Sequence, residues 1–130
     1  NIKPIKESGQ LNFISRTDRI VKNVFNNIDV FFADGHTESQ MIPMINFNGN
    51  KIVFMADLLP STGHIPLPYV MGYDTRPLLT LDEKQLFLEL AADNNYILFL
   101  EHDPINECCT VKKTEKGIRL DKCFNLKDIL

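Results

Sequence analysis

KIVFMADLLP, residues 51–60, is the stretch of sequence from which the fold of the chain can be predicted. Its run Ile52–Ala56 is apolar without alternation, which is typical of a strand covered on both faces. Asp57 follows directly, and open α/β sheets place their sites at the carboxyl ends of strands. Residues 96–100, YILFL, repeat this design, and His102 stands two positions after them. The sequence therefore predicts two buried strands, each followed by a side chain that can bind a metal.

The residues before this stretch predict further antiparallel strands. Asn48–Gly49 is the strongest hairpin signal in the chain, because both residue types accept the positive φ angles of a type I′ turn. This turn joins a strand over Met41–Phe47 to the strand that begins at Ile52, and Pro43 suggests an irregularity or an edge position. The remaining upstream expectations are a leading loop over 1–9, a short half-exposed strand over 10–15, a segment open to helix or strand over 17–27 and a strand over 28–32.

A long loop, one helix and one hairpin are expected after Asp57. Leu58–Pro77 is rich in Pro and Gly but also carries apolar and aromatic side chains, so we predict an ordered loop that forms a substrate wall. A helix is predicted over Thr80–Asp93, with Thr80 and Glu83 as a capping box. The remaining downstream expectations are an inward helix face of Leu86, Phe87 and Leu90, a hairpin over 107–113 and 118–124, and a first helical turn over 125–130.

The composition is that of an ordinary globular domain. The chain has 130 residues, 44% hydrophobic and 24% charged, which predicts a single domain over 1–130 with its own core. A net charge of -3 without a basic stripe argues against nucleic acid as a partner. No apolar run reaches the roughly 18 residues of a membrane span, and the first residues show no secretory signal. Because the chain begins with Asn1, we expect it to be processed or part of a longer protein.

The cysteines indicate a reducing compartment. There are three of them, two adjacent, which is a poor framework for disulfides. We predict buried structural thiols and a cytoplasmic protein. A redox site on Cys108 and Cys109 is rejected, because adjacent cysteines close only a strained ring and nothing nearby would lower their pKa.

A few polar residues are candidates for chemistry. Imidazole and carboxylate side chains both bind Zn, Mn or Fe, so Asp57, His102 and His36 are the prime candidates, with Gln40 and His64 next. The alternative is that Asp57 is a turn residue and the histidines are satisfied polar groups. Turn and capping roles are expected for Asp34, Glu38 and Asp103.

The order of these motifs resembles the second half of the metallo-β-lactamase fold. The motif GHTESQ, residues 35–40, resembles the family's GHTxGH-like motif. It is followed by Asp57 after a hairpin strand and by His102 after a later strand. The loop from Asp57 through Asp74, followed by a helix and the strand before His102, resembles the organophosphate-hydrolase and lactonase branch. The resemblance covers about residues 28–105. It implies the C-terminal half of an αβ/βα sandwich, an α/β (α+β) fold with a mixed, mostly antiparallel sheet and helices on one face.

The resemblance also implies a metal site with two departures. Asp57 would bridge two metals and His102 would bind the second one. On this resemblance the last position of the motif holds a ligand, and that position is Gln40 here; an amide oxygen is a weaker ligand than imidazole, so His36 is the alternative. The family's HxHxDH motif, which carries further ligands and the water-activating Asp, is absent from the 130 residues and is expected upstream. No catalytic residue is therefore assigned within this chain.

The sequence thus leads to two competing functions. The first is part of a hydrolase that uses a divalent metal, Zn or else Fe or Mn, to cleave an ester, lactone or phosphoester bond of a small molecule. His64, Tyr69 and Tyr73 would line its substrate side, and its partner would be the missing N-terminal half or another copy of the chain. The second is a non-catalytic fragment or degenerate-site member that serves as a folding or oligomerisation module.

Overall fold

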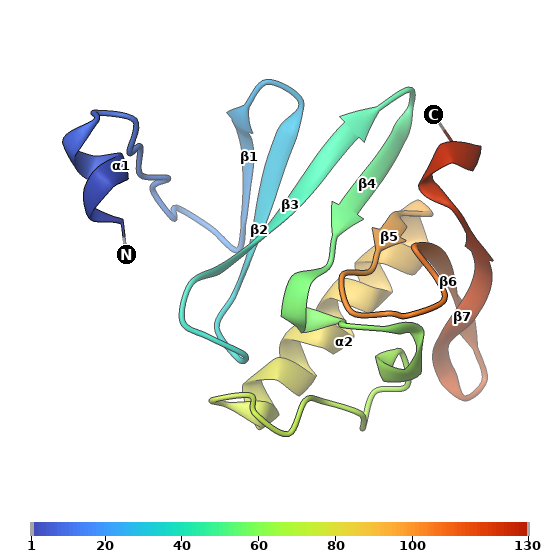
Figure 1. Cartoon of the computed structure of the whole chain (residues 1–130). Helices are drawn as coiled ribbons and strands as arrows, with labels where there is room; N and C mark the ends of the chain where they lie inside the picture. The colour runs from blue at the N-terminus through green and yellow to red at the C-terminus, as the bar shows by residue number, and fades with distance from the viewer. Residues whose placement is uncertain (1, 130) are drawn as a thin grey trace.

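The computed structural model describes residues 2–129, which form one seven-stranded mixed sheet with helices (Figure 1). The strands lie side by side in chain order from β1 to β7. Their bounds are β1 Ile20–Phe25, β2 Ile28–Ala33, β3 Gln40–Phe47, β4 Asn50–Phe54, β5 Ile97–Phe99, β6 Cys108–Thr114 and β7 Gly117–Phe124. The helices are α1 Lys3–Glu7 and α2 Pro77–Asn94, and short 3-10 turns cover Ala56–Leu58, Thr62–His64 and Leu126–Asp128. Within the described residues, no helix is both long and apolar enough to cross a membrane.

The sheet is mostly antiparallel, as predicted, with one parallel pair in the middle. The predicted hairpin at Asn48–Gly49 is confirmed: φ is 49° and 78° at these two residues, and the turn joins β3 to β4. β4 and β5 are parallel, and the connection between them passes through α2. A parallel pair needs such a crossover because the chain must return to the same end of the sheet.

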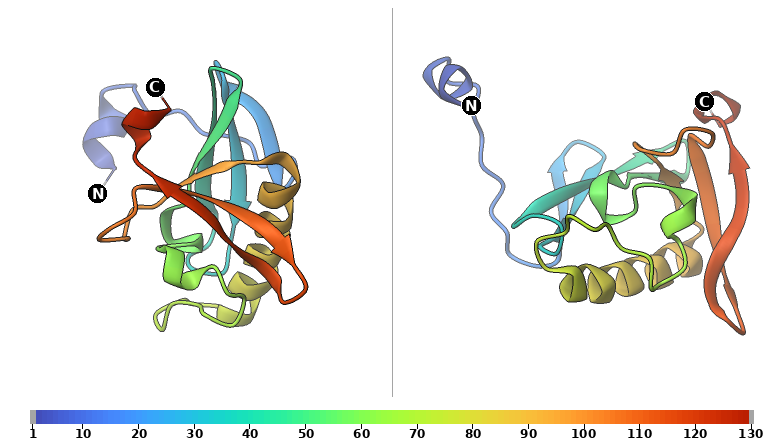
Figure 2. Two further views of the ribbon diagram at one scale, coloured as in Figure 1. Left: turned by 90° about the vertical axis from the view of Figure 1, so that its right-hand side faces the viewer. Right: turned by 60° about the horizontal axis from the view of Figure 1, so that its bottom comes forward.

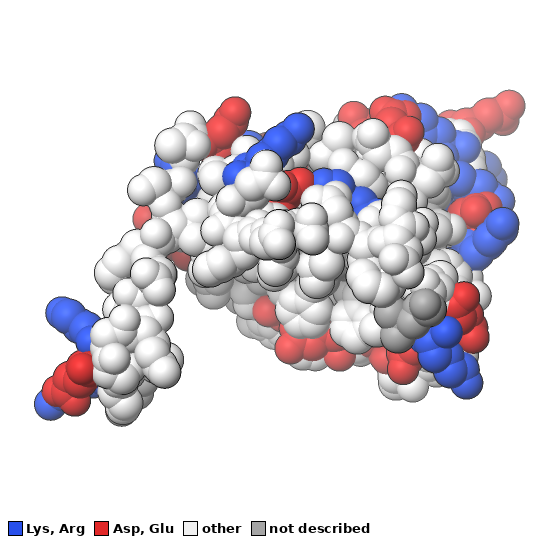
Figure 3. Space-filling view, turned by 90° about the horizontal axis from the view of Figure 1, so that it is seen from above, with Lys and Arg blue, Asp and Glu red and all other residues white. Residues whose placement is uncertain are grey.

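The main core lies between the sheet and α2. Figure 2 shows α2 running along one face of the sheet, with the segment after β4 at its N-terminal end. Phe87 of α2 is fully buried, and its ring packs edge-on against Phe31 of β2 at 5.1 Å between centroids. A second, smaller cluster covers part of the other face, where the C-terminal segment packs on Ile52, Ile97 and Cys108. Seen from above, the middle of the molecule is largely uncharged and Lys, Arg, Asp and Glu lie around its rim (Figure 3).

The predicted helix is present, but its first residue, its capping box and its buried face were predicted wrongly. α2 begins at Pro77 rather than Thr80, since Pro suits the first turn of a helix, where its missing N–H is not needed. Thr80 and Glu83 therefore lie inside the helix, both buried, and form no capping box. The predicted inward residue Leu86 is 51% exposed, because the buried face is displaced toward Lys84, Phe87 and Leu88.

The structure also corrects or decides the predictions for the upstream residues. The half-exposed strand over 10–15 does not form, and Phe13 is 85% exposed in an extended segment without a partner strand (Figure 2). Within the predicted leading loop the structure has the short helix α1, and the ambiguous segment 17–27 is the strand β1. β3 is not an edge strand: Pro43 pairs with Val30 of β2 but lies beyond the last β3–β4 pair, so its missing N–H costs no bond there.

Two of the three thiols are buried as predicted. Cys108 and Cys109 have no exposed surface, and burial raises the pKa of Cys108 to about 11 and that of Cys109 to about 12. The prediction was wrong for Cys123, which faces solvent on β7, the last strand of the sheet. Cys123 pairs in register with Cys109, and the described cysteines are all free.

Candidate metal centre

The sheet topology brings three of its strand ends to one edge. β2 and β4 each run antiparallel to β3, and β5 runs parallel to β4, so β2, β4 and β5 all point the same way. One candidate residue stands three positions after the last residue of each strand. These residues are His36 after β2, Asp57 after β4 and His102 after β5. Strands that run in the same direction have their carboxyl ends at the same edge of the sheet, so these three side chains lie together at that edge.

Asp57 lies between the two imidazoles. Nε2 of His102 is 3.3 Å from Asp57 Oδ1, and Nε2 of His36 is 3.5 Å from Asp57 Oδ2. The Asp57 side chain is 26% exposed and that of His102 48%, so this cluster opens to solvent on the His102 side. The backbone N–H of His102 donates to the carbonyl of Pro60 at 3.1 Å, which ties the loop after β5 to the loop after β4.

His36 is held by a buried carboxylate that the sequence analysis did not single out. Nδ1 of His36 lies 2.9 Å from Oδ1 of Asp74, whose side chain is fully buried. When Nδ1 carries the proton and donates it to Asp74, Nε2 keeps a free lone pair and faces Asp57. The other oxygen, Oδ2 of Asp74, has no hydrogen-bond partner within residues 2–129. Asp74 was missed because 38 residues separate it from His36, and only the fold brings the two together.

Of the two alternatives for the remaining ligand position, His36 is the residue that reaches Asp57. Gln40 is the first residue of β3 and pairs with Ala33 of β2. Its Oε1 is buried and has no hydrogen-bond partner among the described residues. Glu101, which the sequence analysis also passed over, does approach the cluster: single ligand atoms of Asp57, Glu101 and His102 all lie within 4.8 Å of one another. Its position directly before His102 was the available signal.

The residues predicted to line the substrate side lie on the loop after β4. Tyr69 and Tyr73 are 60% and 61% exposed, and the Tyr73 ring stands edge-on to His36 at 5.7 Å between centroids. Nδ1 of His64 is 2.8 Å from Oγ of Ser61. Burial and the nearby charge of Lys84 lower the pKa of His64. Tyr73 is thus the member of this set whose contact with the cluster is observed.

Asp103 and Asp34, two of the three acidic residues expected to serve turns, accept hydrogen bonds from backbone N–H groups a few residues away. Asp103 accepts hydrogen bonds from the backbone of Thr62, Ile105 and Asn106 and from the Thr62 hydroxyl. Burial raises its pKa, but these hydrogen bonds outweigh burial and hold the pKa well below the ordinary range. Asp34 pairs with Arg16 through two hydrogen bonds of 2.8 and 2.7 Å, and this contact lowers the pKa of Asp34 strongly.

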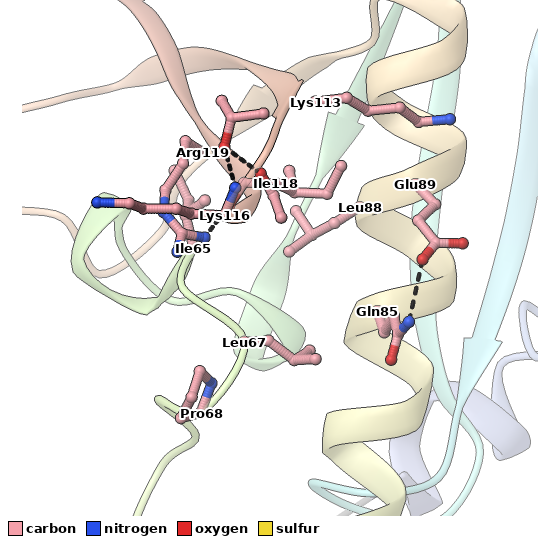
Figure 4. Close-up of a pocket in the computed structure, with 12 residues that line it drawn as sticks. Ile65, Leu67, Pro68, Gln85, Leu88, Glu89, Lys113, Lys116, Ile118 and Arg119 are labelled. Carbon is pink, nitrogen blue, oxygen red and sulfur yellow. Dashed lines mark hydrogen bonds between the residues drawn. The ribbon is translucent and has the colours of Figure 1, made fainter.

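A cavity of about 530 Å³ lies away from the candidate centre, between α2, residues 65–68 and the β6–β7 hairpin (Figure 4). Its floor is apolar, and on the helical side Gln85 donates to Glu89 at 3.0 Å. Neither the two imidazoles nor Asp57 lines it. The candidate centre is therefore an open cluster at the sheet edge, separate from this cavity.

Known structures share this arrangement of strands. A probable metal-dependent hydrolase from Staphylococcus aureus matches with 21% identity and a TM-score of 0.71, over 91% of this chain and 42% of its own. AbOPH, a hydrolase of the β-lactamase superfamily, matches with 16% identity and a TM-score of 0.77, over 95% and 42%. AidC, a dizinc quorum-quenching lactonase solved with its product N-hexanoyl-L-homoserine, matches with 22% identity and a TM-score of 0.73, over 91% and 40%.

These similarities settle the fold. The chain folds as one part of the metallo-β-lactamase architecture, as the sequence predicted, and it spans about two fifths of the length of the structures it matches. No known family profile matches the sequence. No curated protein matches it either.

Proposed function

We propose that this chain is the C-terminal half of a metal-dependent hydrolase domain of the metallo-β-lactamase superfamily and supplies His36, Asp57 and His102 as metal ligands. The observation that carries the proposal is the position of the Asp57 carboxylate, whose two oxygens each face the Nε2 atom of a different histidine. Imidazole and carboxylate side chains suit Zn, Fe or Mn, and Glu101 is a further carboxylate within 4.8 Å of Asp57 and His102. For the ligand position at which the sequence left Gln40 and His36 as alternatives, this proposal chooses His36.

The contact between His36 and Asp74 supports a metal at this place. Histidines that bind metals usually donate their second ring N–H to a carboxylate or a carbonyl, which fixes the tautomer and the ring. Asp74 is buried and makes this contact through Oδ1 at 2.9 Å, and the Nε2 of His36 then faces the cluster.

Metal-assisted hydrolysis is the chemistry that such a centre serves. A divalent metal bound there would polarise the scissile bond and lower the pKa of a water molecule. The two imidazoles and Asp57 would hold the metal, and Tyr73, Tyr69 and His64 would border the substrate. Ester, lactone and phosphoester bonds of small molecules are the substrate class, in keeping with a similar structure that is a lactonase with a bound product.

The remaining ligands would come from the other part of the domain. A catalytic zinc site has at least three protein ligands, and a two-metal site needs more than this chain offers. We infer that an upstream HxHxDH segment completes the site, either in the same protein or, failing that, through association of copies. The free thiols fit a reducing, cytoplasmic setting.

The competing function is a non-catalytic folding or oligomerisation module. The same distances favour it in one respect, because Asp57 and two protonated imidazoles can satisfy each other without a metal. The two functions differ in metal affinity, which the chain can show by itself.

Zinc titration of the purified chain tests the proposal, with binding followed by calorimetry. The unmodified chain should bind Zn²⁺, and His36→Ala should weaken binding by at least about 10-fold through loss of a ligand. Gln40→Met is the matched control, since it removes a buried polar group at the rival position and should leave the affinity unchanged. A chain that binds no Zn²⁺, or that loses binding through Gln40→Met alone, would contradict the assignment. In the protein that contains the complete domain, Asp57→Asn should abolish metal-dependent hydrolysis of the lactone, ester or phosphoester that is turned over.

A further inference from the structure

Two adjacent charged residues are buried in the middle of α2. Glu83 and Lys84 are 2% and 1% exposed, and charged side chains are rarely buried to this extent without partners. Successive side chains on a helix point about 100° apart, so the two residues do not face each other. Each one instead contacts a different loop at the edge of the sheet where the candidate centre lies.

Glu83 holds the loop that carries His36. Its carboxylate accepts hydrogen bonds from the backbone N–H groups of Asp34, at 2.9 and 3.0 Å, and of Gly35, at 3.0 Å. Arg19 of the extended segment before β1 completes the set by pairing with Oε1. The loop is also held from the start of α2, because the N–H groups of residues 75 and 76 donate to the carbonyls of residues 36 and 35 at 3.2 and 2.8 Å. The backbone of His36 is thereby fixed against the helix.

Lys84 holds the loop that carries Asp74. Its Nζ donates to the carbonyl oxygens of His64 at 3.0 Å, Pro66 at 3.4 Å and Tyr69. An ammonium group has three donors and no acceptor, so three carbonyls satisfy it fully. Burial lowers the pKa of Lys84 to about 8, which leaves the ammonium form in the majority at neutral pH. These three carbonyls lie in the ten residues before Asp74.

The two loops meet where Nδ1 of His36 lies 2.9 Å from Oδ1 of Asp74. We propose that Glu83 and Lys84 are positioning residues of the candidate centre. Glu83 sets the backbone that presents His36, and Lys84 sets the loop that presents Asp74. One turn of α2 thus determines whether the Nε2 of His36 faces Asp57. This inference rests on the proposed function, because the position of His36 has a consequence only if His36 binds a metal.

Nitrogen-15 spectra of the histidine rings test the inference without a metal. The chain contains only His36, His64 and His102, so the ring signals of a histidine-labelled sample can be assigned one by one. Lys84→Met keeps the length of the side chain but removes the three donors, and should shift the ring signals of His36 away from the Nδ1–H form. His102 lies on the loop after β5, which neither Glu83 nor Lys84 contacts, so its signals should move less than those of His36. A general loss of stability would instead broaden all three histidines together.

Zinc affinity is the second readout. Lys84→Met and Glu83→Gln should each weaken Zn²⁺ binding by about 10-fold, the usual effect of losing an outer partner of a ligand. Lys116→Met at the exposed β6–β7 turn is the matched control and should change neither the spectra nor the affinity. If Lys84→Met does not fold, Glu83→Gln tests the positioning role instead, because Glu83 contacts the loop that carries His36.

The outcomes separate this inference from the proposed function. A folded variant of either residue with unchanged His36 signals and unchanged affinity would overturn the positioning role. Loss of folding in both variants would also overturn it, because the residues would then serve stability in general. Shifted His36 signals in variants of a chain that binds no Zn²⁺ would uphold the positioning role and refute the metal function.

Discussion

Replacement of Gly35 by alanine tests most directly how the candidate centre is packed. Gly35 directly precedes His36, and its backbone lies against the first turns of α2. A Cβ atom at this position would lie 2.3 Å from both the backbone N and Oγ1 of Thr80 and 2.5 Å from its Cα. Non-bonded carbon contacts are favourable only near 3.5–4.0 Å, so the loop or the helix would have to move by roughly 1 Å.

The cost of Gly35→Ala follows from what this movement breaks. Overpacking against side chains costs about 1–3 kcal/mol, and here the obstacle is backbone that cannot rotate away. A shift of the loop would also lengthen the 3.0 Å bond from Gly35 N–H to Glu83 and the 2.8 Å bond from residue 76 to the Gly35 carbonyl. Each lost bond is worth about 1 kcal/mol, so the free energy of unfolding should fall by about 3–5 kcal/mol.

Urea unfolding followed by circular dichroism measures this loss. With a slope of about 2 kcal/mol per molar urea, the midpoint should fall by roughly 1.5–2.5 M. Gly72→Ala is the matched control: its Cβ would meet nothing within 4 Å and its φ is not left-handed, so stability should be unchanged or slightly higher. A Gly35→Ala midpoint within experimental error of the Gly72→Ala midpoint would refute the packing argument.

Two further predictions concern acid stability and thiol reactivity. The pKa of Asp103 is depressed below its ordinary 3.8, so the stability from its ionised form is complete above that value and is lost as the pH falls through the lower, folded-state pKa. Asp103→Asn should therefore lower the free energy of unfolding at pH 7 and flatten its decline below about pH 4, measured by urea titrations at several pH values; an unchanged decline would contradict this. For the thiols, brief alkylation of the native chain at pH 8 followed by peptide mass spectrometry should find the label on exposed Cys123, because burial raises the pKa of Cys108 to about 11 and of Cys109 to about 12. Equal labelling of all three thiols in the native chain would show that the β5–β6 core is open.

Much of the candidate centre was visible in the sequence because strand ends are encoded locally. The apolar runs before Asp57 and His102 predicted buried strands, and the Asn48–Gly49 turn fixed how β3 returns to β4. Local patterns also misled. Thr80 and Glu83 have the spacing of a capping box, yet both are buried within α2, where Thr80 packs against Gly35 and Glu83 binds the loop before His36.

What the sequence determined by itself is therefore the strands from residue 28 onward, their turns and the polar residues that follow them. These features depend on side-chain period and on turn chemistry, which act over a few residues. Only the tertiary structure decided that the ends of β2, β4 and β5 share one edge, and that His36 contacts Asp57. It also brought Asp74 to His36 across 38 residues. Such contacts depend on strand direction and register, which are fixed when the whole sheet packs against α2 and which no short stretch of sequence contains.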